Sequence, residues 1–200
     1  FQGMEQEGLA ILERAREKTG IRIVTEVMDT EQVEAVATSA DIIQIGTRNM
    51  QNFSLLKKVA TCNRPVLLKR GMSATLDEWL MAAEYLLAGG NKNVILCERG
   101  VRTFTDHTRN TLDLSVVPPV KENSHLPILI DPSHGTGRRN YVPAMALAGL
   151  AAGADGLMVE VHPDPSTAMS DGAQTLDFKE FDRLLESLRA LAEPLERNIG

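Results

Sequence analysis

The sequence predicts an α/β fold built around a parallel sheet, and two observations carry this prediction. Six short apolar runs rich in Val, Ile and Leu recur along the 200 residues, without the polar alternation of a half-exposed strand. Helical patterns lie between these runs, so strand and helix alternate along the chain. This order indicates a (β/α)8 TIM barrel of which about six of the eight strand–helix units are present, in a single partial barrel domain over residues 1–200.

The elements follow from local signals, taken in chain order. A leading helix with Leu9, Leu12 and Ala15 on one face is expected to run to Gly20. Because a leading helix needs a strand before it, the order fits a barrel lacking its first strands better than a complete open sheet. The expected strands cover residues 21–27, 42–45, 66–68, 94–97, 127–130 and 156–161. The signals for the other helices are a capping box at Thr75 and Glu78 with a stop at Gly89-Gly90, a 141–152 helix ending at Gly153, and an Asp177 cap on a helix ending near Pro194.

Composition excludes several classes of protein. A content of 43% hydrophobic and 24% charged residues is ordinary for a globular domain, and the longest apolar runs fall far short of the roughly 20 residues that a membrane helix needs. The net charge of −6 argues against a nucleic-acid or anionic-membrane surface. Only Cys62 and Cys97 are present, far apart, so we expect no disulfide framework and a cytoplasmic location.

Polar or charged side chains lie at essentially every expected strand end, at the edge where parallel barrels form their active sites. Three of them, Arg48, Lys69 and Arg99, are cations from three different strand ends, which predicts a pocket for a small, strongly anionic ligand. Salt bridges within the protein are the alternative reading. The strand-end residues are Glu26, Gln44, Arg48, Lys69, Arg70, Glu98, Arg99, Asp131, His134, Glu160 and His162.

A divalent-metal site is predicted from His134, Glu160 and Asp171. One imidazole and two carboxylates suit a divalent ion that polarises a carbonyl oxygen, although their spacing matches no compact ligand motif, and a lone strand-end His is more often structural. His162 is the competing imidazole, but its His-Pro-Asp-Pro setting is typical of a rigid turn. His107 and His125 are expected on the surface.

At these residues the chain resembles the 3-deoxy-D-arabino-heptulosonate 7-phosphate (DAHP) synthases of the class-I beta type. The matching blocks cover nearly the whole chain in order: Phe1-Gln-Gly3, 44–52, 67–71, 95–100, 108–113, 131–134 with 137–139, and 159–165 through 170–171.

The resemblance implies a metal-dependent condensation of phosphoenolpyruvate with erythrose 4-phosphate, the entry step of the shikimate pathway. It implies that Arg48, Lys69 and Arg99 hold phosphoenolpyruvate and that His134, Glu160 and Asp171 bind Mn, Fe, Co or Zn. Glu26 would lie near the reacting carbons. We assign Lys69, Glu26 and His134 to catalysis, and Glu98 and Asp131 to substrate binding beside the three cations. Members of the family usually form homo-oligomers, so a dimer or tetramer is expected.

The chain departs from the family pattern at its front. Family members carry a metal-binding Cys and a Lys-Pro-Arg-Thr-Ser type segment before the position of Phe1, and Cys97 matches a different block. If the chain were the whole molecule, we would expect an incomplete barrel with three of four metal ligands and little activity. If it is a part, the full enzyme assignment holds.

Two alternatives stay open. The 3-deoxy-D-manno-octulosonate 8-phosphate synthases, which use arabinose 5-phosphate, resemble the chain at 97–100, 162–165 and 171–172, whereas blocks 108–113 and 137–139 favour the heptulosonate family. The other alternative is a non-catalytic barrel fragment that keeps the anion pocket as a binding module.

Overall fold

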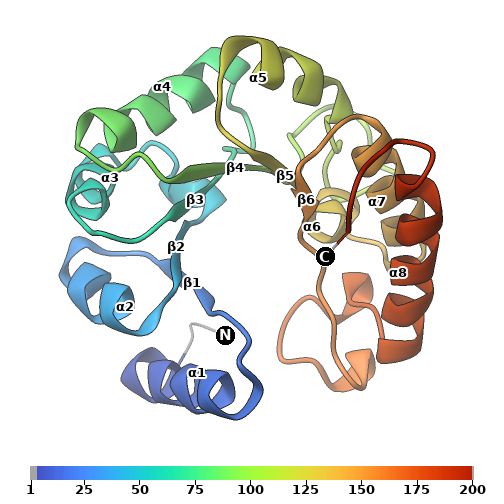
Figure 1. Ribbon diagram of the computed structural model, residues 1–200, viewed down its shortest axis with the longest axis horizontal. Coiled ribbons are helices and arrows are strands. Elements are labelled where there is room, and N and C mark those ends of the chain that lie inside the picture. Colours follow the sequence, from blue (N-terminus) through green and yellow to red (C-terminus); the bar gives the residue numbers. More distant parts are fainter. Residues whose placement is uncertain (1–3, 200) are drawn as a thin grey trace. The chain divides into compact units, whose positions relative to one another are not determined.

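The computed structural model describes residues 4–199, so the expectation for Phe1-Gln-Gly3 lies outside the described residues. The chain divides into two compact units, Phe1–Leu96 and Cys97–Gly200. In each unit the paired strands follow chain order, β1-β2-β3 in the first unit and β5-β6 in the second. Six strands alternating with helices confirm the predicted α/β class and the six strand–helix units (Figure 1).

The first unit contains three complete parallel strands and the helices that follow them. Strands β1 and β2 pair with Glu26 opposite Gln44, and β2 pairs with β3 with Ile45 opposite Leu68. The three strands therefore end at the same edge. The elements are α1 (Glu5–Thr19), β1 (Val24–Val27), η1 (Thr30–Gln32), α2 (Val33–Ser39), β2 (Ile42–Ile45), η2 (Thr47–Asn49), α3 (Phe53–Ala60), β3 (Val66–Lys69) and α4 (Leu76–Ala88).

Strand β4 (Val94–Glu98) begins in the first unit and ends in the second. In the second unit β5 pairs in parallel with β6, with Leu129 opposite Gly156. Helices α7 and α8 lie side by side (Figure 1), and Val142, Ala146, Leu184 and Leu188 belong to one buried cluster. The elements are η3 (Leu114–Val116), α5 (Val117–Asn123), β5 (Ile128–Ile130), α6 (Pro132–Thr136), η4 (Arg139–Tyr141), α7 (Val142–Ala151), β6 (Gly156–Leu157), η5 (Pro165–Thr167), η6 (Gly172–Gln174) and α8 (Phe178–Ala192).

The predicted helix signals are confirmed. Both capping boxes are present, one joining Thr75 to Glu78 and the other joining Asp177 to Glu180. Helix α7 lies one residue inside the predicted range at each end, and Gly153 has a φ of 99°, which glycine adopts without the steric penalty of a Cβ. No helix among residues 4–199 combines the length and apolarity needed to cross a membrane.

Two strand predictions were too long by three or more residues, and the 127–130 prediction was too long by one. Residues 21–23 lie outside β1, and Ile21 is 70% exposed directly after the left-handed Gly20 that ends α1. The last predicted strand, 156–161, forms a ladder over only two residues. Beyond them the chain turns to the segment before α8, where Val161 bridges Leu176 and the Leu176 N–H donates to the Glu160 carbonyl at 2.9 Å.

Candidate metal centre

His134 lies on the short helix α6, directly after β5. The residue that begins this helix, Asp131, accepts a hydrogen bond from the His134 backbone N–H at 2.9 Å and lies 2.8 Å from the ring Nδ1. The Asp131 side chain is fully buried. Because a carboxylate accepts the Nδ1 proton, the lone pair of the neutral imidazole is on Nε2, the atom that faces Glu160.

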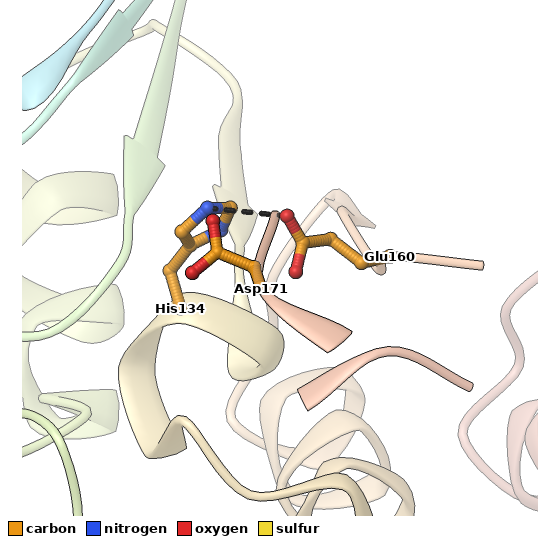
Figure 2. Close-up of side chains that lie close together, drawn as sticks. All are labelled: His134, Glu160 and Asp171. Carbon is orange, nitrogen blue, oxygen red and sulfur yellow. Dashed lines mark ion pairs between the residues drawn. The ribbon is translucent and has the colours of Figure 1, made fainter. Parts of the chain in front are cut away.

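Glu160 and Asp171 complete a cluster with His134. One ligand atom from each of the three lies within 4.8 Å of the others, and Figure 2 shows the side chains turned toward one another. His134 Nε2 is 3.4 Å from Glu160 Oε1. The side chains are 21%, 27% and 30% exposed for His134, Glu160 and Asp171, so the cluster is partly shielded and still open to solvent.

Each carboxylate is held by its backbone. The Glu160 N–H donates to Ser133 Oγ at 3.1 Å, which fixes the segment after β6 against α6. Asp171 has a φ of 54°, in the left-handed region that few non-glycine residues occupy, and its carbonyl accepts hydrogen bonds from Gln174 N and Thr175 Oγ1. Asp tolerates this region better than most residues, and the two hydrogen bonds to its carbonyl hold the backbone there.

Burial raises the pKa of Glu160, and the carboxylates of Asp171 and Asp131 add to this effect, whereas His134 and the hydrogen bond from Gln174 oppose it. A bound cation would remove this unfavourable charge interaction. The imidazole and carboxylate donors fit a divalent first-row ion, and the set does not distinguish Mn, Fe, Co and Zn.

Arg99, directly after β4, is an unusual buried cation. It is only 6% exposed, and its Nη1 atom has no hydrogen-bond partner. Burial lowers the pKa of Arg99; the Asp131 carboxylate opposes this effect and the Arg109 cation adds to it. A buried guanidinium with an unpaired N–H favours an anionic ligand, because an unsatisfied buried donor is costly.

Glu98 and Asp131, predicted to bind substrate, both make contacts within the protein. The fully buried Glu98 carboxylate accepts hydrogen bonds from the Gly100 and Asp113 backbone N–H groups at 2.6 and 3.4 Å. Asp131 orients His134, as described above. Their assignment to substrate stays a prediction.

In the first unit, Glu26 and Gln44 lie beside each other as the strand register requires. Gln44 Nε2 is 3.4 Å from Glu26 Oε2, and the carboxylate covers Gly46 so closely that a Cβ there would lie 2.0 Å from Oε1. Lys69 ends β3 and is 6% exposed, whereas Arg48 is exposed in η2.

Arg70 is buried over the Trp79 ring and donates to the Ala74 carbonyl. The grouping of Arg48 and Lys69 with Arg99 stays a prediction.

The remaining histidines behave as predicted. His162 Nδ1 lies 2.7 Å from the Asp164 carbonyl oxygen in a local turn, and His107 and His125 are exposed. Sequence reasoning missed Arg109 and Gln174, which contact the two carboxylates of the cluster. One signal was available for Gln174. It lies three residues after Asp171, and one turn of 3-10 helix places residues with this spacing on the same side of the helix.

Parallel strands alternating with helices, and a His–Glu–Asp cluster beyond the carboxyl ends of β5 and β6, define an α/β protein with a candidate divalent-metal centre. The chain belongs to the DAHP synthetase I family, which matches residues 1–197.

Relatives agree with this assignment. The chain is 52% identical over 195 residues to the phospho-2-dehydro-3-deoxyheptonate aldolase of Thermotoga maritima, covering 98% of this chain and 58% of the relative. It is 31% identical over 203 residues to the 2-dehydro-3-deoxyphosphooctonate aldolase of Protochlamydia amoebophila, covering 96% of this chain and 73% of that protein. The chain therefore spans a little over half the length of the Thermotoga relative.

Solved structures agree as well. The crystal structure of the Thermotoga maritima phospho-2-dehydro-3-deoxyheptonate aldolase matches with a TM-score of 0.98 at 50% identity, over 100% of this chain and 59% of that one. A truncated form of the Thermotoga maritima 3-deoxy-D-arabino-heptulosonate 7-phosphate synthase matches with a TM-score of 0.97 at 50% identity, over 100% of this chain and 76% of that one.

Proposed function

We propose that the protein carrying this chain condenses phosphoenolpyruvate with erythrose 4-phosphate and water to give 3-deoxy-D-arabino-heptulosonate 7-phosphate and phosphate, the first step of the shikimate pathway. The observation that carries the proposal is the His134–Glu160–Asp171 cluster in a chain that matches the DAHP synthetase I family almost end to end. The higher identity to the heptulosonate relative, 52% against 31%, supports erythrose 4-phosphate over arabinose 5-phosphate.

His134, Glu160 and Asp171 would hold the divalent ion, with Asp131 keeping the imidazole in the tautomer that presents Nε2. When bound, the ion would supply Lewis-acid polarisation of the aldehyde carbonyl. Phosphoenolpyruvate is a weak carbon nucleophile, so it needs an activated aldehyde. The identity of the ion is not fixed by this donor set.

The cations act on the other substrate. Arg99, with its unpaired Nη1, would donate to the phosphate or carboxylate of phosphoenolpyruvate, and we propose that Arg48 and Lys69 act with it. Their positive charge would stabilise the departing phosphate. Lys69 is also the proton donor in this proposal, since its ammonium group ends β3 and can supply a proton to a reacting oxygen.

Glu26 would position the attacking water, because Gln44 and Gly46 fix its carboxylate at the end of β1. As C3 of phosphoenolpyruvate forms its bond to the aldehyde carbon, positive charge develops at C2. Water adds there, and the C2–O bond to phosphate then breaks. The substrate-binding roles of Glu98 and Asp131 are part of the same proposal.

The cellular setting is proposed on similar grounds. With only Cys62 and Cys97, far apart in the sequence, a disulfide framework is not expected, and this favours a reducing cytoplasm. The partners are the two small phosphorylated substrates and further copies of the same chain in a dimer or tetramer. An acidic chain with a net charge of −6 does not favour nucleic acid as a partner.

The test is an assay of the full protein with Mn²⁺, phosphoenolpyruvate and either aldose phosphate, following release of inorganic phosphate. We expect turnover with erythrose 4-phosphate and its loss in His134→Ala and Arg99→Met. Turnover with arabinose 5-phosphate alone would favour the octulosonate reaction instead. Binding of phosphoenolpyruvate without turnover of either sugar would favour the non-catalytic alternative.

A further inference from the structure

A chain of hydrogen bonds links the carboxylates of Asp171 and Glu160 through the side chains of Arg109 and Gln174. Arg109 Nη1 donates to Asp171 Oδ1 at 2.7 Å and to Gln174 Oε1 at 3.1 Å. Gln174 Nε2 then donates to Glu160 Oε2 at 2.7 Å. One guanidinium and one amide thereby connect Asp171 to Glu160, which lie on separate segments of the chain.

The direction of this chain of bonds is fixed by chemistry. A guanidinium has only donors, so the amide oxygen of Gln174 must face Arg109. The amide NH2 must then face Glu160, whose carboxylate has only acceptors. Gln174 is 2% exposed, so water cannot easily replace either contact. Arg109 therefore determines the orientation of the amide that holds Glu160.

The backbone of Arg109 is attached to the helix that carries His134. The Arg109 N–H donates to the Thr136 carbonyl at 2.9 Å, and the neighbouring Asn110 side chain donates to the His134 carbonyl at 3.0 Å. Gly137 is required for this approach, because a Cβ there would lie 2.5 Å from the Arg109 Cβ. The loop that carries Arg109 and Asn110 thus contacts Asp171 and His134 directly, and it contacts Glu160 through Gln174.

These contacts occupy one oxygen of each carboxylate. Gln174 takes Glu160 Oε2, which leaves Oε1, the oxygen 3.4 Å from His134 Nε2, turned toward the cluster. Arg109 takes Asp171 Oδ1, which leaves Oδ2. With one oxygen engaged on each, both carboxylates are arranged to bind an ion through a single oxygen.

We propose that Arg109 and Gln174 are positioning residues that set the affinity and binding mode of the metal centre by holding Glu160 and Asp171 as single-oxygen ligands. The inference rests on the metal-binding part of the proposed function. Single-oxygen binding leaves more positions on the ion for substrate and water than two-oxygen binding does. Such supporting contacts typically change metal affinity by about 10–100-fold.

Two effects of opposite sign must be separated in the test. Arg109 carries a positive charge that repels a cation, so its removal alone would strengthen metal binding. Its side chain is 48% exposed, and solvent therefore screens this repulsion. Gln174 is neutral, and its replacement removes the orientation without changing the charge. The decisive variant is Gln174→Met, which keeps a similar volume and makes neither hydrogen bond.

The experiment is a Mn²⁺ titration of the full protein without substrate. Calorimetry measures the Kd, and electron paramagnetic resonance records the spectrum of the bound ion. We expect the Kd for Mn²⁺ to rise about 10–100-fold in Gln174→Met and the spectrum of the bound ion to change, because Glu160 is freed to bind through two oxygens. Arg109→Met should weaken binding in the same direction, and Arg109→Lys, which keeps the charge, should recover part of the loss.

The matched control is Arg138→Met. Arg138 lines the same open pocket of about 650 Å³ as Arg109, but its guanidinium lies over the Tyr141 ring. Its loss removes the same charge without a ligand contact, so the Kd should stay within about twofold of the parent.

The outcomes separate the two proposals. A parent protein that binds no Mn²⁺ overturns the metal-binding function. If the parent binds Mn²⁺ and Gln174→Met binds it equally well with an unchanged spectrum, the positioning role is wrong. Should Gln174→Met fail to fold, as judged by circular dichroism, the half-exposed Arg109 decides: unchanged Mn²⁺ affinity and spectrum in Arg109→Met overturn the inference.

Discussion

Asp131 and His134 are joined by two hydrogen bonds, one to the backbone and one to the imidazole. The buried carboxylate begins helix α6 through the His134 N–H and accepts the ring proton at Nδ1. The residue that starts the helix is thus also the residue that sets the imidazole tautomer. Local folding and ligand geometry depend on the same side chain.

Replacement of Asp131 by Asn should separate these two roles. Asn is as good a residue at a helix start as Asp, so helix α6 should still form. The amide can donate to Nδ1, which favours the tautomer with its proton on Nε2 and without a lone pair for metal. We expect Mn²⁺ affinity, measured by calorimetry, to fall about 10–100-fold. Asp106→Asn, which removes the same charge from an exposed residue, should bind as the parent does.

Gly46 provides space for the Glu26 carboxylate. Its φ of −69° is open to any residue, so the glycine is required for contact distance and not for conformation. In Gly46→Ala the new methyl group should displace the flexible end of Glu26. We expect a large loss of kcat with little change in melting temperature.

A double variant checks this reason. Glu26→Ala should lose kcat by itself, and adding Gly46→Ala to it should cost little more, because the displaced group is already gone. Independent losses in the two variants, multiplying in the double variant, would contradict the contact explanation.

The sequence predicted those parts of the fold that depend on local signals. Continuous apolar runs and capping boxes each depend on a few adjacent residues, so the sequence alone identifies them. Both capping boxes are present at Thr75 and Asp177, as predicted. The end of the last strand was wrong because Val161 leaves the ladder for Leu176, a pairing over 15 positions that no local pattern contains.

The site residues also divide into those that the sequence predicts and those that only tertiary contacts identify. His134, Glu160 and Asp171 could be chosen because their chemistry is distinctive and two of them follow strand ends. Arg109 could not, since an Arg in a loop has many structural uses, and for Gln174 the spacing of three residues from Asp171 was too weak a signal to separate it from an ordinary buried amide. Their role follows from the tertiary hydrogen bonds that Arg109 donates to Asp171 and Gln174 donates to Glu160.

Two glycines with similar backbone angles should differ in their tolerance of alanine. Gly90 has a φ of 103° with nothing within 4 Å of a Cβ, whereas Gly100 has a φ of 95° and a Cβ there would lie 2.7 Å from the Asn110 Cβ. Gly90→Ala should lower the free energy of unfolding by about 1–2 kcal/mol from backbone strain alone. Gly100→Ala should cost about 1–3 kcal/mol more from overpacking. Urea unfolding measures both, and equal losses would contradict the contact argument.

Arg99 should contribute more to ligand binding than to the stability of the fold. Its buried Nη1 lacks a partner, but Arg99→Met would also leave the buried Asp131 carboxylate without a nearby cation, so we expect the free energy of unfolding to fall by no more than about 3 kcal/mol. Phosphoenolpyruvate should raise the melting temperature of the parent and not of this variant. The exposed Arg102 is the control, since Arg102→Met should keep the ligand-induced shift. A marked loss of stability without ligand would mean that Arg99 is chiefly structural.

The start of helix α8 should make part of the stability depend on acid. The hydrogen bond from the Glu180 N–H lowers the pKa of Asp177 below the usual Asp value of about 3.9, burial partly opposes this, and the Arg139 cation lowers the pKa further. A depressed folded-state pKa means that the stabilisation is complete above the unfolded pKa and is lost as pH falls through the folded one. The Asp177 contribution should therefore begin to fall below about pH 4 and be lost as the pH drops through the folded-state pKa.

Asp177→Asn isolates this contribution, because Asn keeps the acceptor for the Glu180 N–H but does not titrate. Above pH 5 the variant should be less stable than the parent, since it loses the ion pair with Arg139. As the pH falls through the lowered folded-state pKa of Asp177, the two should converge in melting temperature, because the parent carboxyl then becomes protonated as well. Asp177→Ala, which loses the cap altogether, should be the least stable of the three near neutral pH. A difference between Asp and Asn that does not shrink at all as the pH is lowered from 5 toward acid unfolding would show that the carboxylate charge is not the source of the effect.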